Sequence, residues 1–387
     1  MRPSTFAVFF CLLGSVTTSV ILADEPDPIR KRSEPPVIRS SWDDLLDGIE
    51  TTEDWLRRKE SLRRRYLELL RDDRKPAKPP LDMQVHETVI VAGAYKRLLI
   101  SYGVEADERA HAYLGVPINM VGKAPGVVAL PGTYKHGKSR AAGLEDNPEK
   151  AYLDHLCRRG YVVIAPDHFV AGHRIPPEGP YDTTRFHEKH PEWTSVGKFT
   201  YEHSIAVDVL ESLDYVDGEN IGALGHSLGG HGTMFLAAYD ERIKAAAGNC
   251  SASFFRHNPR VEEWSRDRWY VYFKHLRPVF LRGELPPIDF HEIMSLIAPR
   301  AFLDLSAVND GNPLTQRQRV LMLLKVMDAY EFEGAADKFA FFVHGQGHSV
   351  PHESRELIYA WMDKFLKPPA TTTPRLLTEE EQEQVED

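Results

Sequence analysis

Short apolar runs alternate with amphipathic stretches over most of the chain from residue 81 onward. Residues 127–130 are apolar at every position, which is typical of a strand covered on both faces of a parallel sheet. Strands that alternate with helices predict an α/β fold with a mostly parallel sheet, built by right-handed crossovers. We expect the strands of this sheet at residues 127–130, 161–165, 221–224, 243–247, 301–306 and 338–343. We expect the helices between them at residues 147–159, 200–216, 228–239, 290–297, 315–330 and 352–366.

The first strands of this domain differ from the rest because they predict antiparallel pairing. Polar turns separate the strand-like segments 85–92, 95–101 and 109–116. Two long connections, 166–199 and 251–288, interrupt the alternation of strand and helix, and the second is rich in aromatic residues. The predicted architecture is therefore a mostly parallel central sheet with helices on both faces and antiparallel N-terminal strands.

A helical extension precedes the sheet. Ser41 can cap a first short helix, and Thr51 or Thr52 can cap a second helix that extends to about Arg71. The second helix has apolar residues at helical spacing with arginines between them, which favours docking on the main domain with the basic side chains in solvent. A basic surface for nucleic acid or a membrane is the alternative. The apolar residues are Trp55, Leu62, Tyr66, Leu69 and Leu70.

The stretch from residue 220 to residue 232 carries the strongest chemical signal. Its centre, Gly225-His-Ser-Leu-Gly229, matches G-x-S-x-G, with a predicted strand before it and a predicted helix after it. Such a turn strains the backbone of the central residue and lifts its side chain above the sheet, at a helix N-terminus that favours negative charge. We therefore expect Ser227 to be a nucleophile. A glycine-rich turn with an inert serine is the alternative.

Residues that follow the nucleophile supply the other groups that its chemistry needs. A serine hydroxyl requires a general base near neutral pH, and the base requires an acid to orient it. In folds with this G-x-S-x-G turn they follow the serine in the order Asp or Glu, then His. Asp310 lies just past strand 301–306, and His348 lies on a glycine-flanked turn past strand 338–343. We expect these two residues as acid and base, with Asp304, inside its strand, as the rival acid.

Two backbone amides must stabilise the oxyanion that forms during attack on a carbonyl. The amide of Leu228, the residue after the nucleophile, is the first candidate. The second amide is expected from the loop after strand 127–130. Within that loop the amide of Thr133 is our first choice and the amide of Tyr134 our second.

Residues 85–366 resemble the α/β-hydrolase superfamily, and more closely its dienelactone-hydrolase-like and acetyl-xylan-esterase-like branch. The resemblance rests on Gly225-His-Ser-Leu-Gly-Gly230, Asn309-Asp310, Gly347-His348 and Gly137-Lys138. It implies attack by Ser227, proton transfer through His348, an acyl-enzyme, and release by water. Dienelactone hydrolases carry a cysteine as nucleophile, so their own reaction is not implied. Many relatives have His-Gly in the oxyanion loop where this chain has Pro131-Gly132, and this difference leaves the backbone amides in place.

The chain begins with the features of a secretory signal peptide. Arg2 supplies a positive charge, residues 6–22 are largely apolar, and Ala23 is a small residue before two acidic ones. We expect cleavage near Ala23 and secretion or a periplasmic location; an uncleaved membrane anchor is the alternative. The expected organisation is a signal peptide (1–23), a linker and helical extension (24–80), a catalytic domain (81–367) and a disordered acidic tail (368–387).

Composition and charge narrow the classes of partner and cofactor. The chain has 387 residues, 42% hydrophobic and 27% charged, which is an ordinary globular balance, and its formal net charge of −10 argues against a nucleic-acid partner. We expect Cys157 and Cys250 to be free, buried thiols. We expect no metal and no other cofactor, because the sequence has no zinc-site spacing and no glycine-rich nucleotide motif. The histidines at 168, 173, 187, 190 and 203 could be metal ligands, but their spacing matches no zinc site.

The leading hypothesis is a secreted serine hydrolase that cleaves carboxylic esters, with acetyl esters of carbohydrates among the candidate substrates. Its partner would be a small-molecule or carbohydrate ester, with no nucleic acid and no stable membrane insertion after signal cleavage. The aromatic connection at 251–288 would form a wall of the substrate site or only a packed cap. A peptidase similar to prolyl oligopeptidase and a non-catalytic binding protein on the same fold remain alternatives, because fold does not determine function.

Overall fold

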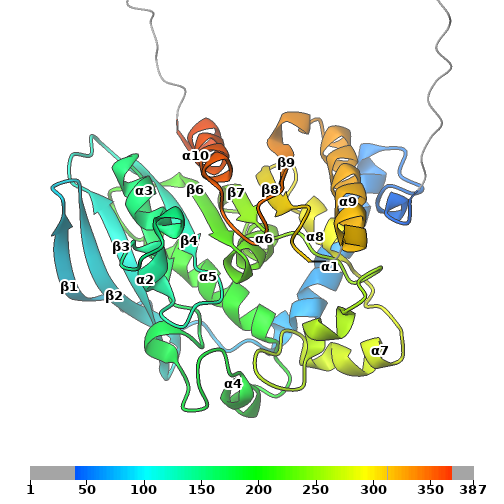
Figure 1. Ribbon diagram of the computed structural model, residues 1–387, viewed down its shortest axis with the longest axis horizontal. Helices are drawn as coiled ribbons and strands as arrows, with labels where there is room; N and C mark the ends of the chain where they lie inside the picture. The colour runs from blue at the N-terminus through cyan, green and yellow to red at the C-terminus, as the bar shows by residue number, and fades with distance from the viewer. Residues whose placement is uncertain (1–39, 312, 368–387) are drawn as a thin grey trace, which may run out of the picture. The chain divides into compact units, whose positions relative to one another are not determined.

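The computed structural model describes residues 40–311 and 313–367 of the chain, and one twisted sheet runs through them (Figure 1). Its nine strands are β1 (Gln84–Val91), β2 (Tyr95–Glu105), β3 (Glu108–Pro117), β4 (Ala124–Leu130), β5 (Val162–Pro166), β6 (Val216–His226), β7 (Ile243–Asn249), β8 (Ala301–Ala307) and β9 (Phe339–His344). The order across the sheet is β1-β2-β3-β5-β4-β6-β7-β8-β9. Pairing is antiparallel from β1 to β5 and parallel from β5 to β9. The predicted α/β architecture with antiparallel N-terminal strands is thus confirmed.

Helices cover both faces of this sheet (Figure 1). They are α1 (Thr52–Leu70), α2 (Lys138–Ala141), α3 (Tyr152–Arg158), α4 (Thr184–Lys189), α5 (Ser195–Glu211), α6 (Leu228–Tyr239), α7 (Arg277–Leu281), α8 (Phe290–Ser295), α9 (Pro313–Phe332) and α10 (His352–Leu366). Buried side chains of α2, α3 and α10 form one core cluster with one face of the sheet. Those of α1, α5, α6, α8 and α9 form the other, larger cluster.

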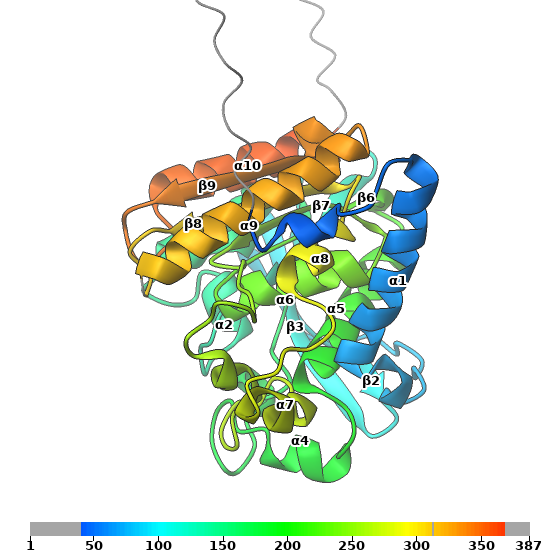
Figure 2. The same ribbon diagram turned by 90° about the vertical axis from the view of Figure 1, so that its right-hand side faces the viewer.

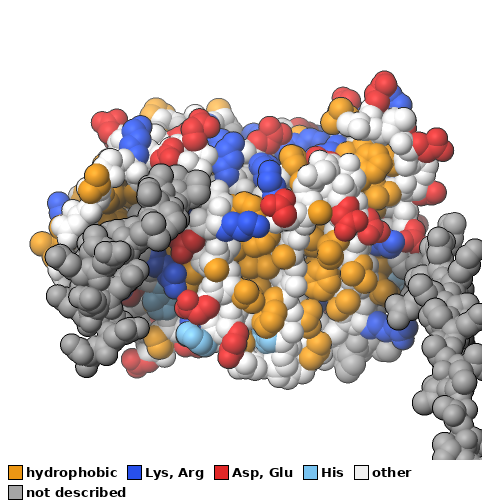
Figure 3. All heavy atoms as spheres, turned by 90° about the horizontal axis from the view of Figure 1, so that it is seen from above, with side chains coloured by type: hydrophobic (Ala, Val, Ile, Leu, Met, Phe, Trp, Pro, Cys, Tyr) orange, Lys and Arg blue, Asp and Glu red, His pale blue; other side chains and the backbone are white. Residues whose placement is uncertain are grey.

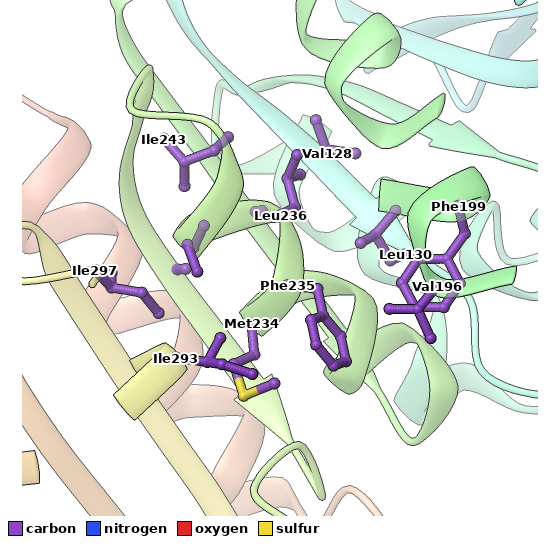
Figure 4. Close-up of a cluster of buried hydrophobic side chains, with 14 of the residues drawn as sticks. Val128, Leu130, Val196, Phe199, Met234, Phe235, Leu236, Ile243, Ile293 and Ile297 are labelled. Carbon is purple, nitrogen blue, oxygen red and sulfur yellow. The ribbon is translucent and has the colours of Figure 1, made fainter. Parts of the chain in front are cut away.

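β4 explains why the central strands are apolar throughout. Val127 and Ala129 belong to the cluster on the α3 and α10 side, whereas Val128 and Leu130 belong to the cluster on the α5 and α6 side. Neighbouring side chains alternate between faces, and both faces are covered, so each position is buried. Burial of each large apolar side chain contributes roughly 1.5–3 kcal/mol. Figure 4 shows β4 side chains among those of α5, α6 and α8; the labelled neighbours include Val196, Phe199, Met234, Phe235, Leu236 and Ile293.

α1 docks along the side of the molecule, as its apolar stripe predicted (Figure 2). Thr51 caps it: the Thr51 hydroxyl accepts from the Asp54 amide at 3.2 Å and the Asp54 carboxylate accepts from the Thr51 amide at 3.0 Å. The five predicted apolar residues are all buried. The Tyr66 hydroxyl donates to the Phe235 carbonyl at 2.6 Å and thereby ties α1 to α6. The basic side chains are only partly in solvent, since Arg63 donates to carbonyl oxygens at the end of α6.

Two predicted helices, one capped by Ser41 and one that starts at Asn147, begin differently in the structure. Ser41 caps no α-helix: residues 43–45 make one turn of 3-10 helix, and Gly48, with φ 71°, redirects the chain soon after. The helix expected from residue 147 is a 3-10 turn followed by α3, because Ala151 leaves the helical region with ψ 52°. The Asn147 side chain makes no cap bond.

α5 also starts earlier than the sequence indicated, at Ser195 rather than at residue 200. Thr194 caps it, since its hydroxyl accepts from the Gly197 amide at 2.8 Å. The sequence pattern did not show this start, because Lys198 and Glu202 lie on the buried face of α5. They form an ion pair of 2.8 Å, so this part of the helix looks polar in the sequence. The predicted connection 166–199 therefore also contains α4 and the first turn of α5.

The outer surface carries mixed side chains. Seen from above the view of Figure 1, hydrophobic groups gather in the middle of the face and charged groups of both signs lie around them (Figure 3). A surface with this much apolar area is ordinary for a folded protein. Among the described residues, no helix has the length and apolar character needed to cross a membrane.

Candidate active site

Ser227 stands at the turn between β6 and α6, with φ 60° and ψ −122°. A non-glycine residue with positive φ is uncommon and strained. Glycines on both sides make the turn sterically possible: a Cβ on Gly225 would collide with the Gly229 carbonyl, and a Cβ on Gly229 would collide with the Leu130 carbonyl. The sequence between β6 and α6 thus folds into the sharp strand-to-helix turn that the glycine pattern predicted.

The two predicted partners of Ser227 lie after the last two strands of the sheet. Asp310 follows β8 and His348 follows β9. His348 Nε2 lies 2.8 Å from Ser227 Oγ, and His348 Nδ1 lies 2.7 Å from Asp310 Oδ2. Because a carboxylate can only accept, Nδ1 carries the proton and Nε2 is left to accept from the serine hydroxyl. The three side chains are therefore arranged for proton transfer from Ser227 to the imidazole.

The environment of Asp310 favours its charged form. The hydrogen bond from His348 lowers the pKa of Asp310, and Arg319 lowers it further, although partial burial raises it. Both groups remain accessible, since the side chain of His348 is 50% exposed and that of Asp310 is 27% exposed. An ionised acid that orients the imidazole also stabilises the imidazolium formed when it accepts a proton.

Asp304, the alternative candidate for the acid, is hydrogen-bonded to residues other than His348. It is fully buried in β8 and accepts from the hydroxyls of Ser251 at 2.6 Å and Ser306 at 2.8 Å. It also accepts from the Ala252 amide at 3.0 Å. Burial raises the pKa of Asp304. These bonds tie β8 to the segment after β7, a structural role.

Cys250 lies directly beside the acid, where the sequence gave no indication of it. Its thiol is buried and accepts from the Asn249 side-chain nitrogen at 3.6 Å. One side-chain atom from each of Cys250, Asp310 and His348 lies within 4.8 Å of the other two. Burial raises the pKa of the Cys250 thiol to about 12, so it stays protonated and can donate to the carboxylate. Cys157 is likewise buried and free, as expected for both thiols.

Asn249 connects the nucleophile turn to the histidine loop, and sequence reasoning missed it. Its carbonyl accepts from the Ser227 amide at 2.9 Å. Its side-chain nitrogen donates to the Ser349 carbonyl at 2.8 Å and to His226 Nδ1 at 2.7 Å. Burial lowers the pKa of His226 to about 2, which keeps its ring neutral and able to accept. The available signal was its position at the end of the strand beside the nucleophile strand.

The loop after β4 lies against the nucleophile turn. A Cβ on Gly132 would meet the His226 carbonyl at 2.9 Å and Ser227 Cβ at 3.5 Å. Among the described residues, the amides of Thr133 and Leu228 have no hydrogen-bond acceptor. The amide of Tyr134, our second choice in this loop, already donates to the Tyr181 hydroxyl at 2.7 Å. Thr133 and Leu228 therefore keep their amides available beside the serine.

A cavity of about 700 Å³ opens beside Ser227 and His348. The aromatic connection 251–288 contributes to it in part: Trp264 and Tyr272 line the cavity, whereas its phenylalanines are buried in the core. Part of the connection thus lines this cavity, and part is packed into the core. The polar side chains of the wall include Ser253, Asn258, Arg260, Glu263, Arg266, Thr315 and Arg319.

Sequence comparison identifies a family and two relatives. The profile of the dienelactone hydrolase family matches residues 110–259. A Bacillus subtilis (strain 168) protein named as a hydrolase, YtaP, is 30% identical over 268 residues, which span 66% of this chain and 84% of YtaP. A carbohydrate esterase from an unknown prokaryote, MZ0003, is 26% identical over 132 residues, 31% of this chain and 29% of its own.

Solved structures share the fold over most of the chain. A glucuronoyl esterase from Solibacter usitatus superposes with a TM-score of 0.64 at 18% identity, and covers 81% of this chain and 94% of its own. A Bacteroides fragilis protein assigned as an acetyl xylan esterase has a TM-score of 0.59 at 18% identity, over 81% of this chain and 84% of its own. At this identity the similarity establishes the arrangement of strands and helices.

Proposed function

The chain belongs to the dienelactone hydrolase family of α/β-hydrolases, and on this premise we propose that it is an exported carboxylic-ester hydrolase that works through Ser227, His348 and Asp310. The observation that carries the proposal is the unbroken line of contacts, 2.8 Å and 2.7 Å long, from the serine through the imidazole to the carboxylate. All three residues line a cavity of about 700 Å³. A reactive group beside a cavity with convergent polar groups is the usual form of an active site.

In the first half of the proposed reaction, Ser227 Oγ attacks the ester carbonyl while His348 Nε2 takes the hydroxyl proton. The resulting imidazolium is stabilised by the Asp310 carboxylate at Nδ1. The negative charge on the former carbonyl oxygen is placed toward the amides of Leu228 and Thr133, with the N-terminus of α6 favouring it. The imidazolium then gives its proton to the leaving alcohol, and an acyl-serine remains.

In the second half, water attacks the acyl-serine. His348 Nε2 accepts a proton from this water, the same amides stabilise the second oxyanion, and the proton returns to Ser227 Oγ as the acid leaves. The half-exposed side chain of His348 suits this step, because water reaches the imidazole from the cavity. The cycle consumes one water and restores all three residues.

The wall of the cavity favours a polar ester such as an acetylated carbohydrate. Hydroxyl, amide and guanidinium groups supply hydrogen-bond donors and acceptors for sugar hydroxyls. Trp264 and Tyr272 supply flat apolar surfaces of the kind that sugar rings pack on. Solved structures with this fold that are named glucuronoyl and acetyl xylan esterases support the same class of substrate.

Hydrolysis of 4-nitrophenyl acetate by the wild type and by Ser227→Ala tests the proposal. We expect the variant to lose at least 10³-fold in kcat, because loss of the nucleophile removes the acyl-enzyme route. Ser212→Ala is the matched control, since this serine is exposed after α5 and does not line the cavity. Equal rates for the wild type and Ser227→Ala would refute the proposal. A fluorophosphonate probe should label the wild type and Ser212→Ala but not Ser227→Ala.

A panel of acetylated sugars, aryl esters and proline-containing peptides separates an esterase from a peptidase with the same triad. We expect turnover of the esters and none of the peptides. Export is tested by N-terminal sequencing of the protein from the culture fluid or periplasm, where we expect a chain that starts near Asp24. The segment 1–23 lies outside the described residues, as does the tail 368–387.

A further inference from the structure

The hydroxyl of Tyr181 lies behind the loop that carries the Thr133 amide. Tyr181 Oη accepts from the Tyr134 amide at 2.7 Å. It lies 3.0 Å from the Gly132 carbonyl and 3.0 Å from the Tyr134 carbonyl, either of which can accept its proton. One side chain thus contacts the residues immediately before and after Thr133. No backbone bond holds Thr133 itself among the described residues. The loop is also held after Thr133, where the Gly137 amide donates to the Tyr134 carbonyl at 2.9 Å and the Gly172 amide to the Lys135 carbonyl at 2.7 Å, but Tyr181 is the side chain that contacts both of its neighbours.

Tyr181 is itself fixed from several directions. Its side chain is 3% exposed, and its amide donates to the Val170 carbonyl at 2.9 Å. Its φ of 65° is a strained value for a tyrosine, and such strain persists only where surrounding contacts impose it. Its ring packs against those of His168, Trp269 and Tyr270, with centroids 5.6 to 6.2 Å apart.

The connection 251–288 helps to hold the segment that carries Tyr181. The Thr183 hydroxyl donates to the Trp269 carbonyl at 2.7 Å and accepts from the Val271 amide at 3.1 Å. The Trp269 indole donates to the Pro180 carbonyl at 3.2 Å. Residues on both sides of Tyr181 are therefore bound to the same connection that supplies Trp264 and Tyr272 to the cavity wall.

We propose that Tyr181 is a positioning residue for ester hydrolysis: its hydroxyl sets the direction of the Thr133 amide and so forms the oxyanion hole. This inference rests on the proposed function and adds a residue to it. Tyr181 does not line the cavity, and its hydroxyl contacts only backbone atoms of Gly132 and Tyr134, so it would act through the loop backbone. Because the site that it organises stabilises charge in the transition state, its loss should lower kcat rather than weaken substrate binding.

Burial supports the two roles of the hydroxyl. Burial raises the pKa of Tyr181, so the group stays protonated and can accept one bond while it donates another. A phenyl ring of the same size would keep the ring contacts and lose only these bonds. It would also leave the Tyr134 amide without its acceptor, which frees the loop to shift.

Tyr181→Phe is the direct test, with 4-nitrophenyl acetate as substrate. We expect kcat to fall about 10- to 100-fold with KM within about twofold, since a misplacement of about 1 Å can cost 10²-fold. The inhibition constant of phenylboronic acid, which forms a tetrahedral adduct with a serine, should rise by a similar factor. A merely structural role would not separate kcat from KM in this way.

Tyr330→Phe is the matched control, because Tyr330 is also buried and its hydroxyl donates to the Arg300 carbonyl at 3.0 Å, away from the site. We expect this variant to keep its kcat. A Tyr181→Phe protein with wild-type kcat would overturn the inference.

The remaining outcomes also decide the question. An equal loss of kcat in Tyr330→Phe, or a Tyr181→Phe protein that does not fold, would assign the hydroxyl to stability and overturn the inference. The proposed function fails separately, if the wild type does not hydrolyse esters or if Ser227→Ala retains activity. Ester hydrolysis that depends on Ser227 but not on Tyr181 would leave the proposed function intact and remove only Tyr181 from it.

Discussion

The two sides of Ser227 are built in different ways. On the histidine side, Asp310 and His348 sit on turns that directly follow adjacent parallel strands, and their side chains are 27% and 50% exposed. On the oxyanion side, the Thr133 loop is pressed against the nucleophile turn and braced by the buried hydroxyl of Tyr181. The first side follows from strand order alone, whereas the second depends on a contact between distant segments.

This difference has a consequence for function. In the proposed mechanism the reacting atoms on the histidine side belong to side chains, so a substitution removes the chemical group itself. The proposed donors on the oxyanion side belong to the backbone, so a substitution there acts only by moving or deleting an amide. The histidine side should therefore be sensitive to side-chain identity, and the oxyanion side to backbone conformation.

Asp310→Asn should have the largest effect of the substitutions that probe this contrast. An amide in place of the carboxylate favours the wrong imidazole tautomer, and in a triad this costs about 10⁴ in kcat. Initial rates with 4-nitrophenyl acetate measure it, with Asp337→Asn, a 67% exposed and remote carboxylate, as control. A loss below tenfold would argue against Asp310 as the orienting acid. Because the pKa of Asp310 lies below its ordinary value, the group stays ionised near neutral pH, and the wild-type rate there should not depend on its titration.

Thr133→Pro and Thr133→Ala test whether the oxyanion side works through the backbone. Proline removes the N–H group, and loss of one oxyanion donor typically costs about 10²–10³ in kcat. Alanine keeps the amide, so its kcat should stay within about threefold of the wild type. Comparable losses in both variants would mean that the Thr133 side chain acts, contrary to our assignment. Thermal unfolding checks that both variants are folded.

Gly132 on the oxyanion side and Gly347 on the histidine side should respond differently to replacement by alanine. A Cβ on Gly132 would press on the His226 carbonyl, so Gly132→Ala should displace the loop and lower kcat by about tenfold. Gly347, beside His348, has φ 64° and open space around its missing Cβ. Gly347→Ala should mainly lower the free energy of unfolding, by about 1–2 kcal/mol, because of left-handed strain. Both quantities, kcat and the free energy of unfolding in urea, are measured for both variants. The contrast is wrong if Gly347→Ala loses more kcat than Gly132→Ala.

His226 lies between the two sides and predicts a smaller, pH-dependent effect on stability. Burial lowers its pKa to about 2, well below its value of about 6.5 in an unfolded chain. The unfolded state therefore binds the proton first, so stability is lost as pH falls below about 6.5. The loss is at most about 1.4 kcal/mol per pH unit. Urea unfolding at pH 7 and pH 5 should show a smaller pH dependence in His226→Gln than in the wild type, and an unchanged dependence would contradict this.

The sequence predicted the histidine side because its determinants are local. Apolar runs located β8 and β9, and in a parallel sheet the turns after such strands meet at one edge, where Asp310 and His348 were expected. The oxyanion loop could be located in the same way. Thr133 was placed before Tyr134 as its donor, but the pattern gave no physical reason for that order. The reason is that the Tyr134 amide donates to Tyr181, and no pattern relates residues 134 and 181.

The errors in the fold have the same origin. The start of α5 was misplaced because Lys198 and Glu202 are buried in ion pairs, Lys198 with Glu105 and Glu202 and Glu202 also with Arg174, so a buried helix face looked polar. Asn249 was missed because its importance lies in bonds to His226 and Ser349, which belong to other strands and loops. Periodicity reports burial of apolar groups and says little about buried polar partners.

The two buried thiols bear on where the protein can work. Cys157 and Cys250 are both free, and burial raises the pKa of each. A protonated, enclosed thiol reacts slowly with oxidants and with disulfides, because the thiolate is the reactive form. The described fold therefore needs neither an oxidising compartment to form cross-links nor a reducing one to protect its cysteines. Its stability and activity should be the same with and without a thiol reductant, on either side of a membrane.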